Sequence, residues 1–223
     1  INLSMLQGMI PGLIPNVDGV YWSLTIEVIF YVIVGILFTT GYLKKIETPI
    51  IVWMALSILV RTLNIYIDNL LLTVIQFYGI MLYSNLFIAG IMFYKLREEK
   101  NVRYHLLILT CAIYEFAFNG LLQGVILSFF FLLFYLLIFG KLRFLNIKSF
   151  TFLGTISYSL YLIHQNIGYI VIDYLEKHGF QNEIFIVVPI LISVGLATIL
   201  TFYVERPIQK YIRKRTVSKK EIV

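Results

Sequence analysis

Residues 121–139 have the sequence LLQGVILSFFFLLFYLLIF, which contains no charged side chain. A transmembrane helix needs about 20 mostly apolar residues, because each residue adds about 1.5 Å and the hydrocarbon core is about 30 Å thick. Turn-forming residues flank the run, with Asn119-Gly120 before it and Gly140 after it. The stretch therefore predicts a helix that crosses a membrane.

The whole chain shares this apolar character. Of its 223 residues 60% are hydrophobic and 13% are charged, against about 45–50% and about 25% in soluble domains. Disorder is excluded, since it needs low hydrophobicity and high charge. The single cysteine, Cys111, excludes a disulfide framework and a cysteine-based zinc site, and we expect no metal. The composition predicts an all-α, polytopic membrane protein.

Six further stretches have the character of spanning helices, so we expect a bundle of about seven spans. The breaks between them carry glycine, asparagine and aspartate. Residues 105–118 are short for a span, and residues 70–94 are long enough to tilt or to begin outside the bilayer. The six stretches are residues 22–41, 49–67, 70–94, 105–118, 153–175 and 184–203.

The positive charges predict the orientation of these spans. Sixteen of the 18 Lys and Arg residues fall in the connections 42–48, 95–104 and 140–149 and in the tail 204–223. These four places alternate with connections that hold only Lys177, and positive residues favour the cytoplasmic side. We therefore expect the N-terminus outside, the C-terminus in the cytoplasm, and a multi-pass protein of the plasma membrane.

The basic cytoplasmic tail, residues 204–223, contributes seven of these cations. Near an anionic leaflet each cation contributes about 1 kcal/mol of attraction. The net charge of +6 therefore indicates contact with membrane lipids rather than with nucleic acid.

No second domain or internal repeat is visible, so we expect one membrane domain over residues 1–223. The abundance of Ile, Lys, Asn, Tyr and Phe points to a bacterial source.

Charged side chains inside a bilayer cost roughly 2.5–3.5 kcal/mol each and usually mark function. Glu27 is the first, and it shares a helix face with Ser23 and Tyr31 because the three are spaced by four residues. A hydroxyl, a carboxyl and a phenol in one line suit the wall of an active site. The alternative is a polar network that only packs helices together.

His164 lies near the middle of the stretch 153–175. Helical periodicity places it on one face with Ser157, Tyr161 and Gly168. A histidine at that depth can move a proton or hold a substrate hydroxyl. The alternative is a packed histidine whose hydrogen bonds serve the fold alone.

Arg61 lies inside a predicted span, with Asn64 and Asp68 on the same face. Its side chain either reaches the outer headgroups or pairs with Glu115, which lies near the outer end of its own span. Asp173 lies close to the outer interface, where we expect it to be solvated.

Three segments together point to a known family. Residues 20–31 read VYWSLTIEVIFY, residues 156–164 read ISYSLYLIH, and Glu205-Arg206-Pro207 follows the last span. They resemble, in order and spacing, the W-S-L-x-x-E-x-x-F-Y, I-S-Y-S-L-Y-L-x-H and E-R-P motifs of the membrane acyltransferase 3 family. Residues 87–92 and 3–7 are similar to two further segments of that family. Its members are integral membrane O-acyltransferases that often modify bacterial surface polysaccharides.

The resemblance implies transfer of an acyl group, commonly acetyl, from a cytoplasmic acyl-CoA-type donor to a hydroxyl of a carbohydrate or lipid-linked saccharide. Acyl-CoA is then a co-substrate, and no bound cofactor is expected. The family's proposed catalytic histidine lies in its first span, about ten residues (nearly three helical turns) after an Arg or Lys, and it has no counterpart here. With an odd number of spans and no leader, the chain resembles the C-terminal part of the family, which we expect to be inactive alone.

Under this resemblance the candidate catalytic residues are Glu27 and His164. We expect Glu27 to orient the groups around the family's base, and His164 to position the acceptor or the acyl carbonyl. Arg206 is expected either to bind the donor's phosphates or to pair with Glu205. The expected substrate-binding residues are Trp22, Ser23, Tyr31, Tyr158 and Tyr161.

Two other functions fit a polar-lined bundle. A transporter or flippase is one, although only Pro189 lies well inside a span and the two halves of the chain show no correspondence. A non-catalytic, degenerate family member is the other. An upstream span in the same reading frame, with a basic residue ahead of a histidine, would favour the enzyme.

Overall fold

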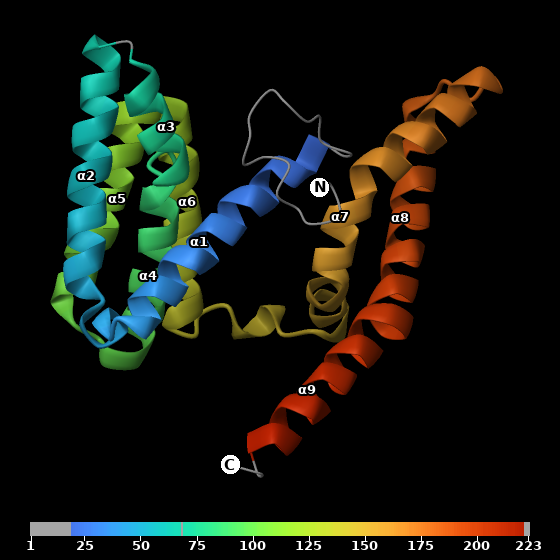
Figure 1. The fold of residues 1–223 in the computed structure, drawn as a ribbon. Helices are drawn as coiled ribbons and strands as arrows, with labels where there is room; N and C mark the ends of the chain where they lie inside the picture. Colours follow the sequence, from blue (N-terminus) through green and yellow to red (C-terminus); the bar gives the residue numbers. More distant parts are fainter. Residues whose placement is uncertain (1–18, 68, 221–223) are drawn as a thin grey trace. The chain divides into compact units, whose positions relative to one another are not determined.

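The computed structural model describes residues 19–67 and 69–220, without the side chains of Lys44 and of residues 215–220. Every regular element in those ranges is helical (Figure 1), which confirms the predicted all-α class. The predicted outside N-terminus, the similarity at residues 3–7 and the position of Asp68 lie outside the described residues.

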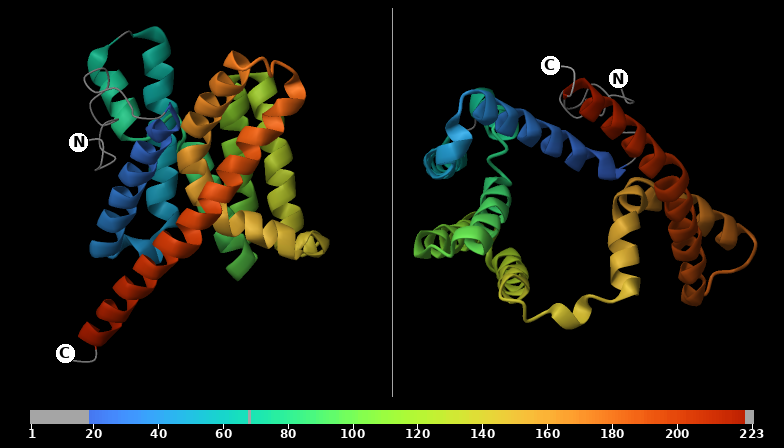
Figure 2. Two further views of the ribbon diagram at one scale, coloured as in Figure 1. Left: turned by 90° about the vertical axis from the view of Figure 1, so that its right-hand side faces the viewer. Right: turned by 90° about the horizontal axis from the view of Figure 1, so that it is seen from below.

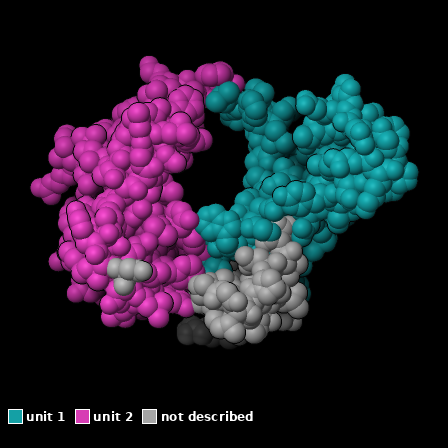
Figure 3. Space-filling model, turned by 90° about the horizontal axis from the view of Figure 1, so that it is seen from above, with its two compact units in different colours: residues 1–25, 145–223 teal, residues 26–144 magenta. Residues whose placement is uncertain are grey.

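The chain divides into two compact units, shown in teal and magenta in Figure 3. Unit 1 comprises residues 1–25 and 145–223, and unit 2 comprises residues 26–144. The boundary falls inside helix α1, Trp22–Thr39. The single membrane domain expected over residues 1–223 stays a prediction.

Unit 2 holds most of α1 and a group of packed helices. They are the 3-10 turn Tyr42–Lys45, α2 (Glu47–Tyr66), α3 (Leu70–Tyr78), α4 (Ser84–Glu99), α5 (Val102–Asn119) and α6 (Leu121–Ile138). Helix α4 lies against both α5 and α2 (Figures 1 and 2). Its inner face is almost completely buried at Ile88, Ala89 and Met92, which pack with residues such as Met54 of α2 and Ile108 of α5.

The structure breaks the predicted stretch 70–94 into α3 and α4. The chain turns between Gly79 and Tyr83, where Ile80 takes a positive φ of 51°. Backbone N–H and C=O groups that a helix break frees inside a packed region need new partners. Trp53 Nε1 donates to the Gly79 carbonyl at 2.8 Å, and the Tyr114 hydroxyl donates to the Met81 carbonyl. One continuous span over residues 70–94 is therefore wrong, because α2 and α5 stabilise the turn.

Unit 1 is a helical hairpin with a long extension. Helix α7 (Lys148–Lys177) is followed by the 3-10 turn Glu183–Ile186 and by α8 (Val187–Ile199), which packs along it. A π-helical segment, Leu200–Glu205, joins α8 to α9 (Arg206–Lys220), and the helical path changes direction there (Figure 1). The predicted basic tail therefore begins as a helix.

Four helical runs among the described residues are long and apolar enough to cross a membrane. They are Gly19–Thr39, Glu47–Tyr66, Leu121–Ile138 and Glu183–Lys214. This supports a membrane protein. The predicted total of seven spans and the orientation of the termini stay predictions.

Candidate active site

An open cavity of about 500 Å³ lies between α7 and α8 in unit 1, and part of its wall, including His164, is exposed. The predicted face of Ser157, Tyr161, His164 and Gly168 lines it, which confirms that helical periodicity brings these four residues together. The remaining lining residues are mostly apolar: Leu160, Ile172, Ile186, Pro189, Ile190, Ser193 and Val194.

His164 is held in one tautomer by its own helix. Its Nδ1 lies 2.9 Å from the Tyr161 carbonyl oxygen and 3.2 Å from the Leu160 carbonyl oxygen. A carbonyl oxygen only accepts hydrogen bonds, so Nδ1 carries the hydrogen, and the neutral imidazole keeps its lone pair on Nε2. Within the described part of the chain, no group bonds to Nε2. His164 can therefore accept a proton or a hydrogen bond from a bound hydroxyl.

Tyr161 joins the start of α1 to α7. Its hydroxyl lies 2.5 Å from the Ser23 hydroxyl and donates to the Val20 carbonyl at 2.9 Å. The Tyr21 hydroxyl also donates to the Leu162 carbonyl, at 3.3 Å. Two of the segments that resemble family motifs therefore meet in unit 1, although Ser23 and Tyr161 are 138 positions apart in the sequence.

Glu27 lies in unit 2, one turn after Ser23 on α1. The Tyr31 hydroxyl donates to its Oε1 at 2.8 Å, so the expected contact between Glu27 and Tyr31 is present. Ser23 does not join this pair, because its hydroxyl bonds to Val20 and Tyr161. The catalytic roles expected of Glu27 and His164 stay predictions.

The other expected substrate residues do not line the cavity. Trp22 and Tyr158 are both exposed, at 47% and 53%, and Tyr161 is the one member of the expected set on the cavity wall. In residues 19–67 and 69–220, no group of three or more His, Cys, Asp or Glu side chains is arranged to hold a metal ion.

The Glu205-Arg206-Pro207 segment contacts α7 through Glu205. Ser159 donates to Glu205 Oε2 at 3.1 Å, Thr201 donates to Ser159 at 2.9 Å, and Gln209 donates to Glu205 Oε1 at 3.0 Å. Ser159 and Thr201 are buried. Residue spacing did not indicate this network, although Ser159 and Glu205 both belong to segments that resemble family motifs.

Arg206 does not pair with Glu205. Its guanidinium lies over the Phe202 ring, 4.3 Å from the centroid, and Glu205 is bonded to Ser159 and Gln209 instead. The ion pair with Glu205 is therefore wrong. Binding of the donor's phosphates by Arg206 stays a prediction.

Of the two arrangements expected for Arg61, the ion pair with Glu115 is wrong, and contact with the outer headgroups stays a prediction. Arg61 donates to Asn119 Oδ1 at 3.0 Å and lies over the rings of Tyr114 and Phe118. Glu115 accepts instead from Asn85 Nδ2 at 2.6 Å. Asp173, expected to be solvated, is exposed and pairs with Lys177 at 2.7 Å.

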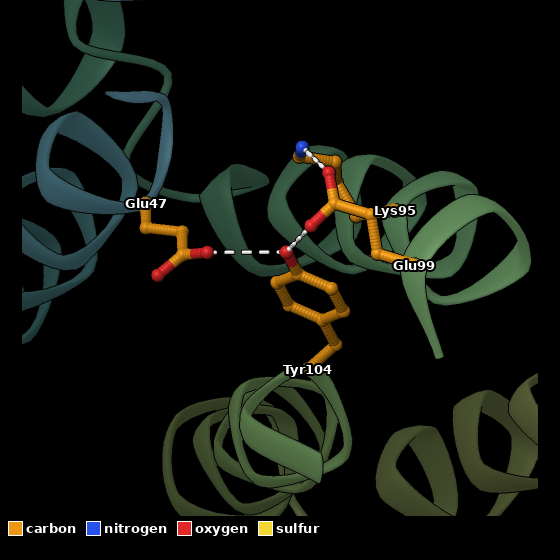
Figure 4. Close-up of polar contacts among 4 residues, drawn as sticks. All are labelled: Glu47, Lys95, Glu99 and Tyr104. Carbon is orange, nitrogen blue, oxygen red and sulfur yellow. Dashed lines mark hydrogen bonds and ion pairs between the residues drawn. The ribbon is translucent and has the colours of Figure 1, made fainter. Parts of the chain in front are cut away.

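A second polar cluster in unit 2 joins three helix ends (Figure 4). The buried Tyr104 of α5 donates from its hydroxyl to Glu99 of α4 and lies 3.1 Å from Glu47 of α2. Lys95 pairs with Glu99 one turn away. Hydrogen bonds from Lys95, and then from Tyr104, lower the pKa of Glu99. The bond to Glu99, together with burial, raises the pKa of the Tyr104 phenol.

These features define a membrane protein in which one of the motif-like segments, on α7, lines a cavity and places a histidine on its wall. A family model described as an acyltransferase domain matches residues 2–204, and the chain belongs to the acyltransferase 3 family. No curated protein and no solved structure matches the chain. The protein is thus an acyltransferase of the membrane, and the family match speaks against the transporter alternative.

Proposed function

We propose that this protein is a bacterial plasma-membrane O-acyltransferase that moves an acyl group from acyl-CoA to the hydroxyl of a carbohydrate or lipid-linked saccharide. The proposal rests on His164, which lies on the wall of the cavity between α7 and α8 and whose Nε2 has no hydrogen-bond partner among the described residues. The family match supplies the class of reaction.

The tautomer of His164 favours one of its two expected roles. An Nε2 lone pair accepts a hydrogen bond, so it suits the hydroxyl of the acceptor and not the carbonyl oxygen of the acyl group. In the reaction the acceptor oxygen attacks the thioester carbonyl, its proton passes to a base, and the carbon–sulfur bond breaks as the thiolate of coenzyme A leaves. His164 orients or deprotonates that hydroxyl.

The charge pattern supports an anionic donor. Basic residues concentrate in the connections 42–48, 95–104 and 140–149 and after residue 204, and such patches raise the local concentration of anions. Arg206 lies at the start of α9, where its guanidinium can reach the donor's phosphates.

The proposal is tested with membranes from cells that make the protein at its natural length. They are incubated with acyl-CoA labelled in the acyl group, and the carbohydrate fraction is analysed for label that mild alkali releases, as an ester requires. We expect ester-linked label in these membranes and not in membranes that lack the protein. Absence of transfer from every acyl-CoA tested, with the protein present in normal amount, would overturn the proposal.

A further inference from the structure

The cavity between α7 and α8 offers few hydrogen-bond donors to an occupant. The Ser157 hydroxyl donates to the Gly154 carbonyl of its own helix, and the Tyr161 hydroxyl is engaged with Val20 and Ser23. His164 Nδ1 is likewise used by its own helix. His164 Nε2 and the lone pairs of the Ser157 oxygen can still accept hydrogen bonds, and the Ser193 hydroxyl is a further polar group on the wall.

Beyond His164 the wall is hydrocarbon. Toward the connection between α7 and α8 it is formed by Gly168, Ile172, Ile186, Pro189 and Ile190. A sugar would bury hydroxyls there without partners, which costs about 1–3 kcal/mol for each unsatisfied group. A hydrocarbon chain has no such cost and gains free energy from burial.

We infer that this cavity holds the hydrocarbon chain of the acyl donor, and that the enzyme transfers acyl groups longer than acetyl. This inference rests on the proposed function. A cavity of about 150 Å³ is large enough for benzene, and about 500 Å³ accommodates a longer chain than an acetyl group provides.

The position of His164 favours the acyl chain over the lipid anchor of an acceptor. The chain of an acyl donor is attached directly to the reacting carbonyl, which must meet the acceptor hydroxyl held at Nε2. A lipid anchor is separated from the reacting hydroxyl by the sugar. Hydrocarbon next to the proton-accepting group therefore fits the acyl chain.

Gly168 provides a direct test of this inference. A Cβ added at Gly168 meets no atom within 4 Å, and the residue lines the cavity. The side chain in Gly168→Leu should therefore occupy part of the cavity. Gly154 is the matched control, since it lies in the same helix, is equally open and does not line the cavity. Both substitutions remove a helical glycine, so their effects on helix propensity cancel in the comparison.

The experiment measures kcat/KM for acetyl-, butyryl-, hexanoyl- and octanoyl-CoA in membranes that contain each variant. Each buried methylene should raise kcat/KM about fourfold until the cavity is full. Hexanoyl is four methylenes longer than acetyl, so we expect the unmodified protein to prefer it by at least about tenfold and, with every methylene buried, by about 250-fold. Gly168→Leu should lower hexanoyl transfer far more than acetyl transfer and bring that ratio close to one, and Gly154→Leu should keep the original ratio.

A third variant, Ile172→Ala, enlarges the cavity and should move the preferred chain toward octanoyl, an effect that loss of folding cannot mimic. If either leucine variant fails to accumulate, the ratio of kcat/KM for octanoyl-CoA to that for hexanoyl-CoA in Ile172→Ala tests the inference. The inference is overturned if the unmodified protein shows no chain-length preference. It is also overturned if Gly168→Leu slows transfer from every donor equally, as it would if the cavity held a lipid anchor of the acceptor. Transfer of acetyl in either case leaves the proposed function intact, whereas no transfer from any donor refutes the proposed function itself.

Discussion

The Ser159 hydroxyl on α7 donates a hydrogen bond to the carboxylate of Glu205, 46 positions later in the sequence, at 3.1 Å. Glu205 ends the π-helical segment between α8 and α9, and Thr201 of the same segment donates to Ser159. Single π-helical turns are frequent at functional sites. Here the π-helical segment places the Glu205 carboxylate and the Thr201 hydroxyl against Ser159 of α7, just over one helical turn before His164.

Replacing Ser159 should weaken unit 1. Ser159→Ala removes the donor to Glu205, in a partly buried setting, and the acceptor of Thr201, in a buried one, so we expect a loss of about 1–3 kcal/mol in the free energy of unfolding. Glu205→Gln keeps an oxygen acceptor and should cost less. The melting temperature in detergent measures both, with Ser157→Ala as control because Ser157 bonds only within its own helix. Equal melting temperatures for Ser159→Ala and the unmodified protein would refute the structural role of this bond.

Tyr161 and Ser23 should behave as one unit. Tyr161→Phe and Ser23→Ala each remove the 2.5 Å contact between their hydroxyls, and each should lower stability by about 0.5–1.5 kcal/mol. Because both mutations delete the same contact, the double variant should lose less than the sum of the two. Additive losses in this cycle would mean that the two hydroxyls are not coupled.

The packing of α6 against Phe116 of α5 requires a glycine at position 124. A Cβ built on Gly124 lies 2.3 Å from the Phe116 ring, so Gly124→Ala should cost about 1–3 kcal/mol through overpacking. Gly35→Ala, where a Cβ meets nothing within 4 Å, should be neutral or stabilising by up to about 1 kcal/mol. Combining Gly124→Ala with Phe116→Leu, which replaces the ring by a smaller side chain, should restore stability. Thermal unfolding of the three variants separates overpacking from a general intolerance of change in α6.

The cluster around Tyr104 predicts how stability depends on pH. The pKa of Glu99 is lowered in the folded protein, first by Lys95 and then by Tyr104. A lowered carboxyl pKa adds stability above the pKa of the unfolded chain, and that stability is lost as pH falls through the folded value. We therefore expect the melting temperature to fall on acidification, and to fall less in Tyr104→Phe, which lacks one of the two hydrogen bonds. An acid dependence that is identical in the two proteins would contradict this assignment.

Local periodicity predicted more of the site than of the bundle. The common face of Ser157, Tyr161, His164 and Gly168 depends only on the pitch of one helix, and the cavity confirms it. The bond between Tyr31 and Glu27 follows from the same pitch. The helix break at Gly79 depends instead on Trp53 and Tyr114, which belong to other helices, so local sequence gave little sign of it.

Sequence reasoning also failed to predict which polar side chains meet between helices. Arg61 and Glu115 have opposite charges and similar predicted depths, yet Asn119 and two aromatic rings surround the guanidinium, and Asn85 takes the carboxylate. Which of several polar residues becomes the neighbour depends on the register of packed helices. Nothing in the sequence distinguishes Asn85, although it is fully buried.

The central claim is that Nε2 of His164 acts on the acceptor hydroxyl. His164→Asn keeps a side-chain N–H donor for the carbonyls of Leu160 and Tyr161 and removes Nε2. His178→Asn is the matched control, because His178 also contacts the carbonyl four residues back, at 2.8 Å, and is exposed.

The decisive measurement is kcat/KM for acyl transfer in both variants, together with their melting temperatures. We predict that His164→Asn loses about 100-fold or more in kcat/KM with an unchanged melting temperature, and that His178→Asn matches the unmodified protein. Full activity in His164→Asn, or a loss of activity that only parallels a loss of stability, would contradict the claim.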